Sequence, residues 1–400
     1  MFITQIKARI RVCLVRITGV IHRLMIYLFR KLPVDRKLII FESEPDLSDN
    51  AYALFDYMRK KRLCEKYKIV WLVDNPKKAN KKKLENVTFV KKFPVFVTFR
   101  LCKYISTFSL YIYDHCNVVQ NKREGQKIIY LSHGGILKAA KGLNHGYKEN
   151  DEYYVTGSAF IDGMKNWTGS TEERIFDFGF PRLDYLINFD SERDKKIFEL
   201  LSLNKYKCVY VWMPTYRKSV SKDLSENYNI GNTGLPILYE NSDLDEFNSL
   251  LKSIDSICLF KTHHLQSKYE LGKKKYTNIV FMDDTFLYEN DIQLYEVLRN
   301  TDVLITDYSS VGFDYMITKK PIIYTLDDYE MYSDNRGFIK DPKTLMAGYT
   351  CKTKKELFDT LKFSVNKVNP FLSRREELLP ILHTHCDGKA SERITEHLCL

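Results

Sequence analysis

The stretch DVLITDYSSVGFDY, residues 302–315, joins a short apolar run to a turn rich in hydroxyl and carboxylate groups. The apolar start is typical of a buried strand, and the part after Ser309 is expected to begin a helix. Ser309 and Ser310 then occupy its first turn, where unpaired backbone amides and the positive end of the helix dipole favour a phosphate. Asp314, one turn further on, can accept a hydrogen bond from a ligand hydroxyl. Alternatively, Asp307 or Ser309 is only a helix cap.

The same alternation of short apolar runs and helix-like segments continues over the chain. The expected strands are residues 37–41, 69–73, 127–131, 208–212, 257–260, 278–281 and 302–305. Short buried strands that alternate with helices, such as the one expected at 52–59, indicate parallel sheets covered by helices. Four hundred residues suggest two such domains, and the Lys-, Ser- and Asn-rich residues 191–207 are the expected boundary.

The composition favours a globular protein with anionic partners. The hydrophobic fraction is 44% and the formal net charge is +11, with lysine and arginine clusters near residues 59–62, 77–83 and 273–275. Such a surface attracts lipid headgroups or polyphosphate-like polymers, although each cluster alone is also what a solvated loop looks like. The basic groups are dispersed and form no recognised nucleic-acid module. Nine cysteines without a C-x-x-C pair fit a reducing cytosol.

The first 31 residues mix apolar and basic side chains at helical spacing. Arginines recur every seventh residue, at Arg9, Arg16, Arg23 and Arg30, beside one arc of apolar side chains. Charges interrupt every stretch that approaches the ~20 residues needed to span a bilayer. They also interrupt the apolar region that a signal peptide requires. We expect a helix that lies in an anionic membrane interface; the alternative is a helix packed on the protein's own core.

Three more polar motifs follow expected strands, where open α/β sheets place their ligands. In chain order they are His133-Gly134-Gly135, Met213-Pro214-Thr215 and Lys261-Thr262-His263. A histidine can move a proton near neutral pH, and the adjacent glycines allow backbone amides to approach a ligand closely. A single such motif is more often structural than catalytic, but several at strand ends together indicate an active site.

These motifs resemble those of the CDP-glycerol glycerophosphotransferase family, the teichoic acid primases and polymerases. The resemblance extends from Phe41 to about Arg393. Five family patterns are matched in chain order. They are H-G-T-P-x-K at residues 133–138, G-x-P-R-x-D at 179–184, A-P-T-[WY]-R at 213–217, K/R-x-H at 261–263 and T-D-Y-S-S-x-x-F-D at 306–314. The chain departs from the family at Gly135-Ile136, which replace Thr-Pro, and at His264, which replaces a frequent Pro.

The resemblance implies a GT-B-like α/β fold, with two Rossmann-like domains and a cleft between them. Residues 1–33 would be the amphipathic membrane-associating helix. Residues 34–192 would form the domain on the acceptor and membrane side. Residues 193–400 would form the domain that binds a CDP-alditol.

The resemblance also implies an activity and a place in the cell. Family members transfer glycerol phosphate, or a related alditol phosphate such as ribitol phosphate, from a CDP-alditol to a hydroxyl of a lipid-linked acceptor, and CMP leaves. The products are teichoic acid or capsule-type surface polymers, and the expected location is peripheral, on the cytoplasmic face of the cell membrane. No acidic D-x-D motif follows an expected strand, so neither a metal ion nor a cofactor is expected.

Particular residues match the chemistry that the family implies. His133 is the expected general base for the acceptor hydroxyl, and His263 is expected to protonate or hydrogen-bond the leaving phosphate. The expected substrate-binding residues are Gly134, Gly135, Lys138, Arg182, Pro214, Thr215, Lys261, Thr262, Ser309, Ser310 and Asp314. Cations, amides and hydroxyls among these suit a diphosphate.

Two other classes of function remain open from the sequence. One is a GT-B glycosyltransferase that uses a nucleotide sugar for capsule synthesis, which a screen of donors would distinguish. The other is a non-catalytic membrane-bound protein that binds polyanions. It would explain the basic clusters and the amphipathic helix, but it leaves the polar motifs at the strand ends without a role.

Overall fold

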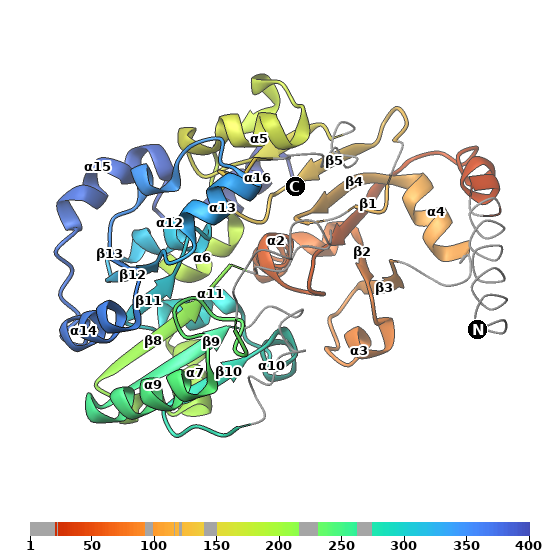
Figure 1. Ribbon diagram of the computed structural model, residues 1–400. Coiled ribbons are helices and arrows are strands. Elements are labelled where there is room, and N and C mark those ends of the chain that lie inside the picture. Colours follow the sequence, from red (N-terminus) through yellow and green to blue (C-terminus); the bar gives the residue numbers. More distant parts are fainter. Residues whose placement is uncertain are drawn as a thin grey trace, which may run out of the picture.

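The computed structural model describes residues 21, 23–92, 99–115, 117–119, 122–139, 150–215, 231–261 and 274–400. Within these ranges the chain forms two parallel sheets with helices packed against them (Figure 1). All seven strands predicted from apolar runs are present. The predicted helix at 52–59 is also confirmed, as part of α2 (Asp49–Lys60).

The first sheet has seven strands in the described part of the chain, in the order β3-β2-β1-β4-β5-β6-β7. Each neighbouring pair is parallel. The strands are β1 (Asp35–Glu42), β2 (Lys68–Val73), β3 (Val87–Lys91), β4 (Phe108–Tyr113), β5 (Lys127–Tyr130), β6 (Glu152–Tyr154) and β7 (Ile175–Phe176). The helices of this half, besides α2, are α3 (Pro76–Asn80), α4 (Phe99–Thr107), α5 (Ile161–Thr168), α6 (Pro181–Ile187) and α7 (Ser191–Leu201).

The second sheet has six described strands in the order β10-β9-β8-β11-β12-β13, again all parallel. They are β8 (Cys208–Met213), β9 (Ser256–Lys261), β10 (Ile279–Met282), β11 (Val303–Thr306), β12 (Ile322–Thr325) and β13 (Tyr349–Cys351). The helices are α9 (Asn241–Ser253), α10 (Asp284–Asn290), α11 (Leu294–Arg299), α12 (Val311–Tyr315), α13 (Tyr329–Arg336), α14 (Lys354–Ser364), α15 (Leu372–Leu382) and α16 (Ala390–His397).

The central strands are apolar along their length because helices cover both faces of each sheet. In β1, Ile39 and Phe41 belong to the same cluster as Leu54 of α2, whereas Leu38 and Ile40 belong to a cluster on the opposite face. This is the alternation that a strand requires of its side chains. Continuous apolar runs therefore predicted these strands correctly.

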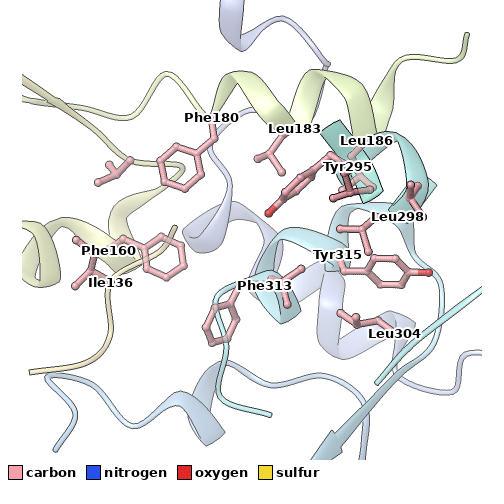
Figure 2. Close-up of a cluster of buried hydrophobic side chains, with 14 of the residues drawn as sticks. Ile136, Phe160, Phe180, Leu183, Leu186, Tyr295, Leu298, Leu304, Phe313 and Tyr315 are labelled. Carbon is pink, nitrogen blue, oxygen red and sulfur yellow. The ribbon is translucent and has the colours of Figure 1, made fainter. Parts of the chain in front are cut away.

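One hydrophobic core is shared by the two sheets (Figure 2). Helix α6, which follows the first sheet, packs against α11 of the second, where Leu183 joins Tyr295 and Leu298 in the cluster. Near the other end of the cluster, the rings of Phe160 and Phe313 lie 5.9 Å apart. Apolar contact thus joins the two halves beside the polar motifs described below.

The C-terminal residues return to the first sheet. The backbone N–H of Thr384 donates to the carbonyl of Thr156 at 2.8 Å. The carboxylate of Asp184, in α6, accepts hydrogen bonds from the N–H groups of Ala390 and Ser391 at 2.9 and 2.8 Å. Helix α16 packs against α2 and α6. The C-terminal residues therefore connect the second half of the chain to the first. The domain limits expected from the sequence stay a prediction.

Most of the predicted N-terminal helix, residues 1–20 and residue 22, lies outside the described residues. Residues 23–29 are helical. Among the helices that the structure describes, none is both long and apolar enough to cross a membrane.

Candidate active site

The polar motifs meet where the carboxyl ends of the two sheets face each other. His133 and Gly134 follow β5 of the first sheet, and Ser309 and Ser310 follow β11 of the second. A β-carbon placed on Gly134 would lie only 2.3 Å from Oγ of Ser310. Gly134 also has φ +155°, which disfavours any other residue. The two loops are therefore in direct contact, as a site between two such sheets requires.

The imidazole of His133 is enclosed by aromatic side chains. Its ring centroid lies 4.5 Å from that of His115 and 6.2 Å from that of Trp167. The hydroxyl of Tyr130 lies 3.2 Å from Nδ1. Burial lowers the pKa of His133 well below its ordinary value, and nearby positive charges lower this pKa further. The ring is therefore neutral at pH 7, with one of its two nitrogens unprotonated.

The departure from the family motif at Gly135 has a steric cause. A β-carbon on Gly135 would lie 2.4 Å from Cε1 of Phe160. Phe160 in turn packs on Phe313 of α12 (Figure 2). In this chain an aromatic ring takes the space that a threonine side chain would need. The loop can therefore keep its position only with glycine.

Lys138 joins the same loop to the second half of the chain. Its backbone forms an antiparallel bridge with Phe338. The neighbouring hydrogen bonds, Ala139 N–H to Gly337 O and Ile339 N–H to Leu137 O, measure 3.1 and 2.7 Å. The ammonium group of Lys138 lies 5.8 Å from the ring centroid of Tyr308, in the loop after β11. The predicted ligand Lys138 therefore borders the serine motif.

Asp307 connects two loops of the second sheet. It is fully buried, and its carboxylate accepts hydrogen bonds from the backbone N–H and the hydroxyl of Thr215 at 2.7 and 2.6 Å. It also accepts the N–H of Ser309 at 2.9 Å. The loops after β8, with Pro214 and Thr215, and after β11 are thus held side by side. Asp307 is a positioning residue, a role that its local sequence does not reveal.

The helix after the serines begins two residues after Ser309, so neither serine lies within it as the sequence suggests. Helix α12 starts at Val311, so Ser310 is its N-cap and Ser309 precedes it. The structure assigns the N-cap to Ser310 and not to Asp307 or Ser309. Asp307 nevertheless accepts the N–H of Ser309 and so supports the backbone just before the helix. Within the described part of the chain, the Ser310 side chain makes no capping hydrogen bond. Both serines are only half-buried. Their hydroxyls are therefore not committed to the helix.

Arg182 lies between the two halves, in a buried charge cluster. Its side chain is 5% exposed. One terminal nitrogen donates to the carboxylate of Asp49 and to the carbonyl of His133, both at 2.8 Å. The other donates to Asp314 at 2.7 Å, and the hydroxyl of Tyr295 also donates to Asp314. The predicted ligands Arg182 and Asp314 are thus brought together and engage each other.

The remaining predicted residues are only partly described. Lys261 ends β9 and pairs with Asp284 of α10, with 2.7 Å between Nζ and Oδ1. Thr262 and the predicted catalytic His263 lie outside the described residues, as does His264. The structure therefore places only the first residue of the K-x-H motif, Lys261, at the end of β9.

Three charged residues of the site were missed from the sequence: Asp49, Asp114 and His115. Asp114 and His115 follow β4 directly, and their signal was present, because the run at 108–113 is apolar and aromatic and ends in Asp-His. Asp49 starts α2 with φ 57°, a conformation that side chains seldom adopt. Nothing in the local sequence indicates that it faces Arg182.

The fold and the motifs together define a class: a two-sheet α/β protein whose polar motifs meet between the sheets. The sequence model described as CDP-Glycerol:Poly(glycerophosphate) glycerophosphotransferase matches residues 24–400. The chain therefore belongs to this family.

Named relatives agree with this assignment. The teichoic acid poly(glycerol phosphate) polymerase of Bacillus spizizenii is 25% identical over 99% of both chains. The teichoic acid glycerol-phosphate transferase of Staphylococcus aureus is 26% identical over 92% of this chain and 94% of its own. A solved structure of the wall teichoic acid polymerase TagF has a TM-score of 0.76 at 24% identity, covering 99% of this chain and 97% of that one. That likeness concerns the fold.

Proposed function

We propose that this protein transfers glycerol phosphate, or a related alditol phosphate such as ribitol phosphate, from a CDP-alditol to a hydroxyl of a lipid-linked acceptor. The observation that carries the proposal is the contact between Gly134 and Ser310. It joins the histidine loop to the serine loop in a chain of the glycerophosphotransferase family. A proton acceptor and phosphate-binding hydroxyls then lie on opposite sides of one junction.

The proposed chemistry is a displacement at the phosphorus that carries the alditol. His133 takes the proton of the acceptor hydroxyl, whose oxygen forms a new bond to that phosphorus. The bond to the bridging oxygen of the diphosphate breaks, and CMP leaves with the electron pair. The hydroxyls of Ser309 and Ser310 donate to the phosphate oxygens, and Lys261 supplies positive charge. His263 acts on the leaving phosphate.

A donor panel tests this function. The purified protein is incubated with a lipid-linked acceptor and CDP-glycerol, CDP-ribitol, a CMP-linked sugar or a UDP-sugar. We expect CMP release with a CDP-alditol and a product whose mass grows by one alditol phosphate. Turnover with a nucleotide sugar alone would contradict the proposal and support a capsule glycosyltransferase. Absence of CMP release from every CDP-alditol would support a non-catalytic polyanion-binding protein.

The serine pair provides a test within the site. Changing both Ser309 and Ser310 to Ala is expected to weaken CDP-alditol binding by at least ~2 kcal/mol, because hydrogen bonds to charged groups contribute roughly 1.5–3 kcal/mol each. Isothermal titration calorimetry would measure the loss. The matched control is Thr353→Ala, because Thr353 caps α14 by accepting the N–H of Glu356 at 3.2 Å. This control should cost about 1 kcal/mol of stability and leave donor affinity intact. The same pattern in the serine variant would contradict phosphate binding.

We also propose that the protein binds an anionic membrane through a surface built from the described end of the N-terminal helix and α4. Its exposed apolar side chains, which we call the apolar face, are Ile21, Leu24, Tyr27, Leu28, Leu32 and Phe99. Exposed basic side chains on the same two segments are Arg23, Lys31, Arg100 and Lys103. An apolar surface bordered by basic groups suits the interface of an anionic bilayer.

The apolar face is attached firmly to the first sheet's half. The rings of Phe29 and Phe99 lie 5.9 Å apart in an edge-to-face contact. A terminal nitrogen of Arg123 donates to the carbonyl of Leu32 at 2.6 Å. Binding through this face would place the enzyme peripherally on the cytoplasmic side of the membrane, where a lipid-linked acceptor is available.

Point variants test the apolar face better than a deletion would. Deleting the N-terminal segment would also remove the Leu32 carbonyl to which Arg123 donates. Leu24 and Leu28 are 57% and 52% exposed. The double variant Leu24→Glu/Leu28→Glu is expected to weaken sedimentation with phosphatidylglycerol vesicles by at least roughly tenfold. The matched control carries Phe363→Glu and Val368→Glu, which replace residues 70% and 65% exposed elsewhere on the molecule. Equal losses in both variants would contradict the assignment.

A further inference from the structure

Asp114 and His115 form a pair beside the proposed base that the chemistry above does not use. They follow β4, which is the parallel neighbour of β5, and His133 follows β5. Adjacent parallel strands end at the same edge of a sheet, so the two histidines become neighbours. Their ring centroids are 4.5 Å apart and their planes are inclined by 34°. His115 therefore packs on the face of the His133 ring.

Asp114 is anchored to α2. Asp114 is fully buried, and its Oδ2 accepts the backbone N–H of Ala51, in α2, at 2.9 Å. Its Oδ1 lies 3.4 Å from Nδ1 of His115. Burial raises the pKa of Asp114 to about 6. Burial lowers the pKa of His115, but the nearby charge of Asp114 outweighs this effect and raises the pKa of His115 overall. The carboxylate of Asp114 therefore favours the protonated form of His115.

The other charged groups around the two rings act in opposite directions. Asp49 at the start of α2 and Glu44 after β1 favour the protonated form of His115. On the side of His133, burial is the main cause of its low pKa, and the positive charge of His115 comes next, followed by Arg182 and Lys138. Tyr130 of β5 lies against Nδ1 and carries no charge near pH 7.

We propose that His115, held by Asp114 against the ring of His133, is a positioning residue whose positive charge keeps His133 unprotonated while the donor is bound. The donor diphosphate brings negative charge to the junction beside Gly134, and negative charge favours protonated imidazole. A protonated His133 has no lone pair for the acceptor's proton. The charge of His115 opposes that effect. This inference rests on the proposed role of His133.

The test uses two readouts on the full-length protein. The first is the titration of His133 by NMR with ¹³C-labelled histidine, assigned by its loss in His133→Gln. The second is the pH dependence of kcat with a CDP-alditol and lipid acceptor. In His115→Gln we expect the pKa of His133 and the acidic limb of kcat to move upward together by roughly one pH unit. Asp114→Asn is expected to move both in the same direction, because His115 then loses its stabilising charge.

Two controls separate charge from packing. His115→Lys keeps a positive charge beside Asp114 and is expected to leave the acidic limb near its original pH. His397→Gln removes another histidine paired with a carboxylate, Glu152 at 3.1 Å, on α16 and away from the site. It should change neither readout.

The outcomes distinguish this inference from the proposed function. An unchanged NMR titration of His133 in His115→Gln would overturn the role of His115, whatever the activity. A shifted titration with an unchanged kcat profile would confirm the electrostatic coupling. It would at the same time show that His133 is not the base.

Discussion

Replacing His133 with alanine is expected to lower turnover by roughly 10²–10⁴-fold, with a much smaller change in donor affinity. The reason is that His133 combines a neutral imidazole with a place beside the serine loop, against which Gly134 packs. Loss of the base removes an interaction made in the transition state, so kcat and kcat/KM should fall together. Steady-state kinetics and calorimetric titration of the donor would measure the two effects separately.

The other histidines supply the comparison. His263 is expected to act on the phosphate side, so His263→Ala should impair donor binding and turnover together. His264→Ala should leave a near-normal rate, because only His263 matches the family position. A His133 variant with wild-type turnover and weakened donor binding would reassign that residue from base to phosphate ligand.

Replacing Arg182 with methionine is expected to lower the free energy of unfolding by about 3–5 kcal/mol. The substitution keeps an unbranched apolar stem but leaves Asp49 and Asp314 without the cation that both contact. It also removes the donor to the carbonyl of His133. Urea denaturation followed by circular dichroism would measure the loss, and turnover should fall because the histidine loop loses an anchor.

A surface pair provides the control for Arg182. A terminal nitrogen of Arg374 lies 2.8 Å from a carboxylate oxygen of Glu377 on α15, and both side chains are exposed. Arg374→Met is therefore expected to change the free energy of unfolding little. If Arg182 instead binds the donor's phosphates, Arg182→Met would keep its stability and raise KM for the donor alone. That result would contradict a structural role for Arg182 and support the phosphate binding predicted from the sequence.

Much of the architecture follows from local sequence. Runs such as 69–73 and 208–212 are apolar at every position because helices cover both faces of a parallel strand, and this pattern can be seen without knowing what the strand pairs with. The polar motifs at the strand ends were found for the same reason. The run at 108–113 was overlooked, and with it Asp114 and His115, although it carries the same signal.

Local sequence predicted seven of the described strands, the parallel α/β class, the family and the proposed base. The partners of the charged groups became known from the packing of the folded chain. Arg182 meets Asp49 and Asp314 from 133 and 132 positions away, and Phe160 takes the space beside Gly135. The spacing of apolar residues indicates which face of a helix or strand is buried, because each side chain's direction follows from its position in the element. The pairing of charged groups depends instead on how the two sheets and the returning C-terminal helix pack. This packing results from the summed contacts of the whole chain.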